Sequence, residues 1–187
     1  GRGRDERVGR PPRGGVKDAI IRDGDQLAAA QDCLKVGGAR HSPDHGLEAW
    51  RADIKGSEYC SVRVRDWADG SDRDDLVEET DGTVVWSADS RAFFYVRLDD
   101  NHRPMRVWRH RLGTPQADDL LVYEEQDAGW FTHIHESASG SFCVIGGGDH
   151  ETSEQRLIEL ADLEAPPSLV AARAGGAAMP AAAGSGW

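Results

Sequence analysis

Short apolar and aromatic runs, separated by turn residues, recur along the middle of the chain. Four of them lie between residues 84 and 123, at 84–86, 92–98, 105–112 and 120–123. Runs of this length bounded by Gly, Pro, Asp and Asn are typical of β-strands and turns. Four antiparallel strands joined by short loops form a meander, which is the repeating blade of a β-propeller. The pattern therefore predicts one complete blade in this stretch.

The turn that precedes the second strand of this unit is repeated. It starts at Ser42, at Ser87 and, more loosely, at Ser137, so that 45 and then 50 residues separate the copies. Four-stranded units at a period of about 40 to 50 residues are typical of propeller blades. We interpret the serines and the acidic residues after them as turn residues, because Ser and Asp side chains bond the backbone two residues on. Pro43 also presets φ for a type I turn.

The remaining apolar runs extend the same pattern. Further strands are predicted at residues 47–52, 59–67, 76–77, 130–135, 142–146, 155–160 and 168–172, and a short helix at 26–32. The predicted fold class is therefore all-β, a partial β-propeller with about three four-stranded antiparallel blades, of which two are complete. Residues 92–98 and 142–146 are expected to be interior strands. Because known propellers close a ring of 4 to 8 blades, we expect a piece of a longer propeller. Its open blade face would make the isolated chain marginally stable and prone to associate.

Composition divides the chain into three predicted segments. Residues 1–17 hold five Arg and five Gly and are expected to be a disordered basic segment, with a nucleic-acid-binding tail as the alternative. Residues 18–173 form the partial propeller. Residues 174–187 are rich in Ala and Gly and are expected to be a flexible tail.

Charge and cysteine usage narrow the class of protein. The chain holds 33 acidic and 22 basic residues, for a net charge of −11, which argues against general nucleic-acid binding. This charge is compatible with attraction of basic peptides, although an acidic surface more often only keeps a protein soluble. No apolar run has the length of a membrane-spanning helix, and no secretory signal is recognised. Three cysteines without a C-x-x-C pair, Cys33, Cys60 and Cys143, favour reduced thiols. The predicted location is the cytoplasm.

Histidines raise the question of a metal site. His133 and His135 lie two apart on one side of a predicted strand, as a two-ligand site requires, and His150 lies between two acidic residues. A zinc site from His133, His135 and one carboxylate is therefore considered. The preferred interpretation is that these are polar residues near the propeller's central channel, and no metal is predicted. The other histidines are assigned to turns and a solvated face: His41, His45, His102 and His110.

Two further patterns are interpreted as structural. Five of the six tryptophans, which could stack on bases or sugars, recur at strand positions, so packing within and between blades is the preferred reading. They are Trp50, Trp67, Trp86, Trp108 and Trp130. Residues 99–101 resemble the opening of a calcium loop but lack its later Gly and Glu. No cofactor is predicted.

Several longer motifs carry a family resemblance. They are GGARHSPDH (37–45), KGSEY (55–59), VRDW (64–67), FFYVRLDDNHRPMRVWRHRLGT (93–114) and HESASGSF (135–142). Together they resemble the N-terminal propeller of oligopeptidase B, a member of the prolyl oligopeptidase family of serine peptidases. The resemblance covers roughly residues 23–173. Because the two ends of the chain do not share it, we also expect a truncated or disrupted reading frame.

The resemblance implies a two-domain cytoplasmic enzyme. In that family a seven-bladed propeller covers an α/β-hydrolase domain with a Ser, Asp, His triad, and oligopeptidase B cleaves short peptides after Arg or Lys. This chain would then be the non-catalytic, substrate-gating propeller. Its partners would be the hydrolase domain and, in the full-length enzyme, short basic peptides.

The chain itself offers no nucleophile in the expected setting. No G-x-S-x-G elbow occurs, and although glycines precede Ser141 and Ser185, neither has the flanking pattern. No catalytic or cofactor-binding residue is therefore predicted, and the chain alone is expected to be inactive. If turnover appeared, the serines beside His133 and His135 would be the first to mutate: Ser137, Ser139 and Ser141. The alternative function is a stand-alone propeller that binds basic proteins through its acidic face.

Overall fold

The protein is described by a computed structural model that covers residues 35–53, 59–148 and 152–175. Its elements are strands, with a single 3-10 turn, η1 (Gln116–Asp118). The strands are β1 (Lys35–His41), β2 (Leu47–Asp53), β3 (Cys60–Asp66), β4 (Asp72–Trp86), β5 (Ala92–Leu98), β6 (Pro104–Arg111), β7 (Leu120–Glu124), β8 (Phe131–Glu136), β9 (Phe142–Gly148), β10 (Thr152–Glu159) and β11 (Ser168–Gly175). No helix in these ranges has the length and apolar character needed to cross a membrane.

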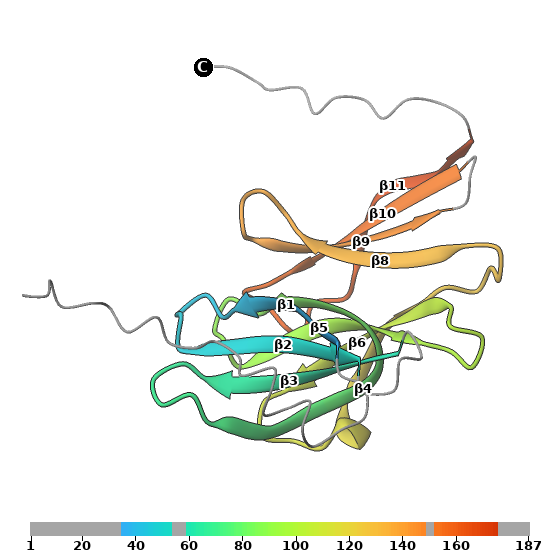
Figure 1. Ribbon diagram of the computed structural model, residues 1–187. Coiled ribbons are helices and arrows are strands. Elements are labelled where there is room, and N and C mark those ends of the chain that lie inside the picture. Colours follow the sequence, from blue (N-terminus) through green and yellow to red (C-terminus); the bar gives the residue numbers. More distant parts are fainter. Residues whose placement is uncertain (1–34, 54–58, 149–151, 176–187) are drawn as a thin grey trace, which may run out of the picture.

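The strands form two antiparallel sheets in sequence order. One contains β1 to β7 and the other β8 to β11, and Figure 1 shows them as two layers. Strand β4 joins two blades within the larger sheet. Its first part pairs with β3 up to Thr80, which also pairs with Arg97 of β5, and its second part pairs with β5 from Val84 onward. Between them the register shifts, and Glu79 and Gly82 adopt positive φ values of 59° and 82°.

The larger sheet is therefore two blades that share one continuous strand. We call residues 35–80 blade 1, residues 83–124 blade 2 and residues 131–175 blade 3. Each blade has four antiparallel strands, which confirms the predicted meanders and places β5 and β9 in blade interiors. Three complete blades are present rather than two and most of a third. The predicted short outer strand and the strand at 84–86 are one 15-residue strand. The described strands do not close a ring.

Two apolar cores fill the spaces between the blades. Because successive strand residues point to opposite faces, each face of blade 2 supplies one core. Phe93 and Tyr95 pack against blade 1, whereas Phe94 and Val96 pack against blade 3. All four are at most 1% exposed. Aromatic and β-branched residues at four successive positions of β5, 93–96, thus explain why this part of the strand can be buried on both sides.

The repeated turn is confirmed as a structural unit. Ser42 and Ser87 each accept a hydrogen bond from the backbone N–H five residues on, at 3.0 Å, and Ser137 does so at 3.1 Å. The bond to the backbone two residues on is made by the third residue of the turn instead, as Asp44 does with Gly46 at 3.0 Å. The fourth residue adopts a left-handed conformation in each copy: His45, Ser90 and Gly140.

Some sequence predictions are corrected or fall outside the described residues. His110 is fully buried and not on a solvated face, whereas His41, His45 and His102 are exposed as expected. Trp67 is 38% exposed in the turn after β3 and packs edge-on against His41, so it is not a core residue. The predicted helix at 26–32, residues 1–17 and residues 176–187 lie outside the described residues. The first two residues of the predicted tail, Ala174 and Gly175, belong to β11. The three-segment division otherwise stays a prediction.

Candidate functional site

The first strands of the three blades come together on one side of the molecule. Strand β1 contacts β4, and β4 contacts β8. The indole Nε1 of Trp86 donates to the carbonyl oxygen of Arg40 at 3.0 Å, which ties the first strands of blades 1 and 2 to each other. A ligand held here would therefore contact two blades at once.

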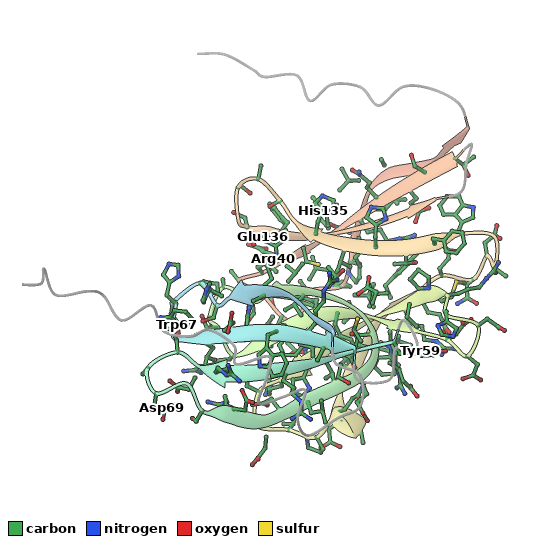
Figure 2. The ribbon with its side chains drawn as sticks, viewed as in Figure 1. Arg40, Tyr59, Trp67, Asp69, His135 and Glu136 are labelled. Atoms are coloured by element: carbon green, nitrogen blue, oxygen red, sulfur yellow. The ribbon has the colours of Figure 1, made fainter. Side chains whose placement is uncertain are left out.

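A cavity of about 250 Å³ lies among β1, β2 and the middle of β4. It is lined by Gly38, Ala39, Arg40, Ala49, Trp50, Arg51, Gly82, Thr83 and Val84. Arg40 is exposed on β1, where Figure 2 labels it, and Arg51 is half-buried on β2. Neither guanidinium forms an ion pair with a carboxylate of the described residues. The cavity therefore carries two positive charges that no carboxylate of the described residues compensates through an ion pair.

The position of Arg51 depends on Gly82. A Cβ atom added at Gly82 would lie 2.5 Å from Cδ of Arg51, and φ there is +82°. Only glycine accommodates both the left-handed backbone and the crossing side chain. The neighbouring Asp81 accepts hydrogen bonds from the backbone N–H and hydroxyl of Thr83 at 2.8 and 3.1 Å. Burial raises the pKa of Asp81, and the Thr83 bonds and the charge of Arg51 offset this only in part.

A second, larger cavity lies near the repeated turns. It measures about 550 Å³ and is lined by Leu47, Arg73, Asp89, Ser90, Arg91, Arg111, Leu112 and Leu163. Its charges are partly compensated, because Arg73 bonds Asp75 at 3.0 Å and Asp89 lies in its wall. The first cavity is therefore the stronger candidate for binding an anionic group.

A buried polar cluster joins blade 1 to blade 2. Its residues do not line either cavity, but Arg73, which bonds Asp75 of the cluster, lines the second one. The ring of His110 lies between two carboxylates, with Nδ1 2.7 Å from Asp119 Oδ1 and Nε2 3.3 Å from Asp75 Oδ1. The His110 and Asp119 side chains are 0% exposed and that of Asp75 is 2% exposed. Tyr95 donates its hydroxyl to Asp119 Oδ2 at 2.7 Å.

The hydrogen bonds of this cluster require a protonated histidine. Ionised carboxylate oxygens only accept, so both ring nitrogens of His110 must donate. Burial lowers the pKa of His110, but Asp119 and Asp75 outweigh it, and the net pKa is raised. Burial raises the pKa of the Asp75 carboxyl. Hydrogen bonds from the backbone N–H of Gly113 and from the side chains of Arg73 and His110 lower it by more, so the net pKa is lowered. Two carboxylates, one imidazolium and Arg73 then sum to zero charge.

The cluster holds the blades together and does not resemble a catalytic site. It has no nucleophile and no exposed ring nitrogen, and the burial of Tyr95 raises the pKa of its phenol. Sequence reasoning missed it, although the alternation of β6 places His110 on the same face as Trp108, which packs against the core between blades 1 and 2. The face that His110 shares with Trp108 was the sequence signal that His110 is buried.

The structure does not bring together those residues singled out for metal binding or catalysis that it describes. His133 and His135 are exposed, with nearly parallel rings whose centroids are 6.1 Å apart. Among the described residues no group of three or more His, Cys, Asp or Glu is placed to hold a metal ion, and His150 lies outside them. The hydroxyls of the three serines bond within their own turn, and in the described ranges none bonds a histidine: Ser137, Ser139 and Ser141.

The other structural interpretations are settled by contacts. Trp50, Trp86 and Trp130 are at most 5% exposed, and Trp108 packs against a core. Asp99 accepts the N–H groups of Asn101 and Arg103 at 2.8 and 2.9 Å, which makes residues 99–103 a self-bonded turn. Burial raises the pKa of the Cys143 thiol to about 12, so it is an unreactive core group.

Comparison with known proteins identifies the fold. Residues 6–184 match the family model of the prolyl oligopeptidase N-terminal β-propeller domain. Protease 2 of Moraxella lacunata is 29% identical over 161 residues, which cover 85% of this chain and 23% of that protein.

Two solved structures agree with this match. Oligopeptidase B from Leishmania major has 29% identity and a TM-score of 0.78, covering 83% of this chain and 22% of that one. Oligopeptidase B from Trypanosoma brucei, with covalently bound antipain, has 32% identity and a TM-score of 0.77, covering 90% of this chain and 24% of that one. The chain thus spans less than a quarter of the length of each. It belongs to the prolyl oligopeptidase family and corresponds to part of the N-terminal β-propeller domain.

Proposed function

We propose that this chain is the substrate-gating propeller part of a cytoplasmic serine oligopeptidase that cleaves short peptides after Arg or Lys. Its partner is a hydrolase domain that carries the catalytic triad. The propeller admits short basic peptides and keeps large folded proteins away from that triad.

The likeness to two oligopeptidase B structures carries this proposal. Both match all but a small part of this chain at identities above the level at which only a fold is shared. The charge of the chain supports it, because a net charge of −11 attracts basic peptides over long range. The turn serines support a non-catalytic role, since their hydroxyls are used to hold β-turns.

A chimaeric enzyme tests the proposal. Residues 35–175 would replace the matching segment of Trypanosoma brucei oligopeptidase B, with the unmodified enzyme as control. We expect the chimaera to cleave a fluorogenic Arg peptide and to leave a folded protein substrate intact, because the blades rebuild the same barrier.

Two outcomes would contradict the proposal. One is a folded chimaera that degrades the folded protein as readily as the short peptide. The other is inhibitor-sensitive hydrolysis by the 187-residue chain alone, which would place a nucleophile within it. If the chimaera lost size selection while the chain bound basic proteins tightly, the stand-alone interaction module would be the better account.

A further inference from the structure

We infer that the 250 Å³ cavity among β1, β2 and the middle of β4 binds the C-terminal carboxylate of a short peptide, through Arg40 and Arg51. This inference deepens the proposed function and rests on it, since it supplies a docking point for one end of the peptide that the propeller admits.

Among the arginines whose side chains the structure describes, Arg40 and Arg51 are the two that lack an ion pair and line the same cavity. Three others also lack an ion pair, but no two of them share a cavity: Arg63, Arg91 and Arg103. Elsewhere in the described chain most arginines are paired, in a protein with an excess of acidic residues: Arg65, Arg73, Arg97, Arg106, Arg109, Arg111 and Arg156. Arg40 and Arg51 have no such pair, yet they line one cavity. A guanidinium presents a planar fork of donors that matches a carboxylate in two-point contact.

The surroundings of the cavity keep it open and keep Arg51 in place. A Cβ atom at Gly38 would meet no atom within 4 Å, so the β1 side has free space. Arg51 crosses Gly82, and Asp81 is close enough to interact with it electrostatically without an ion pair. Because Asp81 already accepts two bonds from Thr83, Arg51 keeps donors for a ligand.

Size and charge select the ligand. Whole-ligand pockets usually measure about 300–1,000 Å³, so a cavity of about 250 Å³ holds an end group rather than a whole peptide. A basic peptide is attracted by the net charge of −11, and its single terminal carboxylate is the group that needs a local positive site. Inorganic phosphate, which carries more negative charge and no basic side chain, is repelled by the same field.

Calorimetric titration of the 187-residue chain tests this inference. The probes are Ala-Ala-Ala-Arg with a free carboxylate, the same peptide with a C-terminal amide, and inorganic phosphate. We expect the free acid to bind about tenfold more tightly than the amide, because the amide cannot form the charged two-point contact. Phosphate is expected to bind more weakly than the acid.

Four variants complete the test, each checked for an unchanged circular dichroism spectrum. Arg40→Gln and Arg51→Gln should each weaken binding of the acid about tenfold without affecting the amide. Arg51→Lys keeps the positive charge but loses the two-point contact of the guanidinium. Its affinity for the peptide acid should therefore lie between those of the wild type and Arg51→Gln. The matched control is Arg91→Gln, which removes the same charge from an arginine of the second cavity and should change nothing.

Three results would overturn the inference. They are equal binding of acid and amide, tighter binding of phosphate than of the peptide acid, and a loss in Arg91→Gln as large as that in Arg51→Gln. None of them alters the cleavage assay of the chimaera, and a chimaera without size selection would leave a positive titration standing. Failure of the inference and failure of the proposed function are therefore distinguishable.

Discussion

The two interfaces between blades are built from different chemistry. Between blades 2 and 3 the core is apolar, and charged side chains border it. Arg109, which is 8% exposed, contacts the Leu163 carbonyl and, at 3.0 Å, the exposed Glu164. Glu125, which is 3% exposed, accepts a hydrogen bond from the hydroxyl of Tyr123 at 2.9 Å. Between blades 1 and 2 an aromatic core adjoins the buried His110 cluster. Both interfaces contain buried charged side chains, but among the described residues only that of blades 1 and 2 contains a buried histidine.

This difference indicates how each interface responds to its surroundings. Apolar packing does not depend on protonation, and the contact of blades 2 and 3 has no buried histidine among the described residues, so it should change little between pH 6 and pH 9. The contact of blades 1 and 2 depends on charges that are buried, and removing one partner of a buried pair is costly. The interface of blades 1 and 2 is therefore the one whose stability should depend on pH.

Removal of a large core side chain should have the largest effect. Phe94→Ala deletes a ring that is 0% exposed at the interface of blades 2 and 3, and we expect a loss of about 3–5 kcal/mol in the free energy of unfolding. Urea unfolding at pH 6 and pH 9 should give the same loss. Leu120→Ala, at a side chain that is 49% exposed, is the control. A loss in Phe94→Ala as small as the control's would show that this interface is not packed.

Removal of the buried histidine should have a slightly smaller and pH-dependent effect. His110→Gln leaves two buried carboxylates without their shared cation, and we expect a loss of about 3 kcal/mol at pH 6. Since the folded-state pKa of His110 is raised, its contribution is fully present below the ordinary pKa near 6.5 and is lost as pH rises through the raised value. The difference between wild type and variant should therefore shrink at pH 9. A difference that grows with pH would contradict the assignment.

A single hydroxyl within the cluster should matter less. Tyr95→Phe removes the donor to Asp119 and leaves the ring in the core. Hydrogen bonds to charged groups are worth about 1.5–3 kcal/mol, and we expect a loss in the lower part of this range by chemical denaturation. Tyr123→Phe is a matched control, because its hydroxyl bonds Glu125 at 2.9 Å outside this cluster. Equal pH dependence of the two losses would count against a distinct cluster.

The rim ion pair should contribute least. Glu164 is 72% exposed, so Glu164→Gln should change the free energy of unfolding by about 0–1 kcal/mol, and added salt should remove the effect. Thermal unfolding at low and high salt measures this. A loss of unfolding free energy as large as that of His110→Gln would mean that the interface of blades 2 and 3 also depends on this ion pair.

The blades could be predicted from sequence because their signals are local. Alternating or continuous apolar runs gave the strands, and the spaced serines at Ser42, Ser87 and Ser137 gave the repeat. The shared strand β4 was missed, since Gly82 and acidic residues separate the apolar positions 76–77 from 84–86 in the sequence. The structure shows that left-handed residues let the chain pass from one blade to the next without a loop.

The polar cluster and the cavity could not be predicted in the same way. Asp75, His110 and Asp119 come from β4, β6 and the segment before β7, and only the contact of two blades brings them together. Arg40 and Arg51 are ordinary surface residues in sequence and share a cavity only because β1 and β2 pair beside Gly82. Both features depend on long-range contacts that no sequence period reveals.

The central claim is that a buried imidazolium links blade 1 to blade 2. Nitrogen NMR of the imidazole of His110 at pH 6.5, the ordinary pKa of a histidine, tests it most directly, with His110→Gln used to assign the signal. The account predicts that both ring nitrogens carry protons that exchange slowly with water. A ring with one unprotonated nitrogen at this pH would contradict it, because one of the two carboxylates would then face a lone pair.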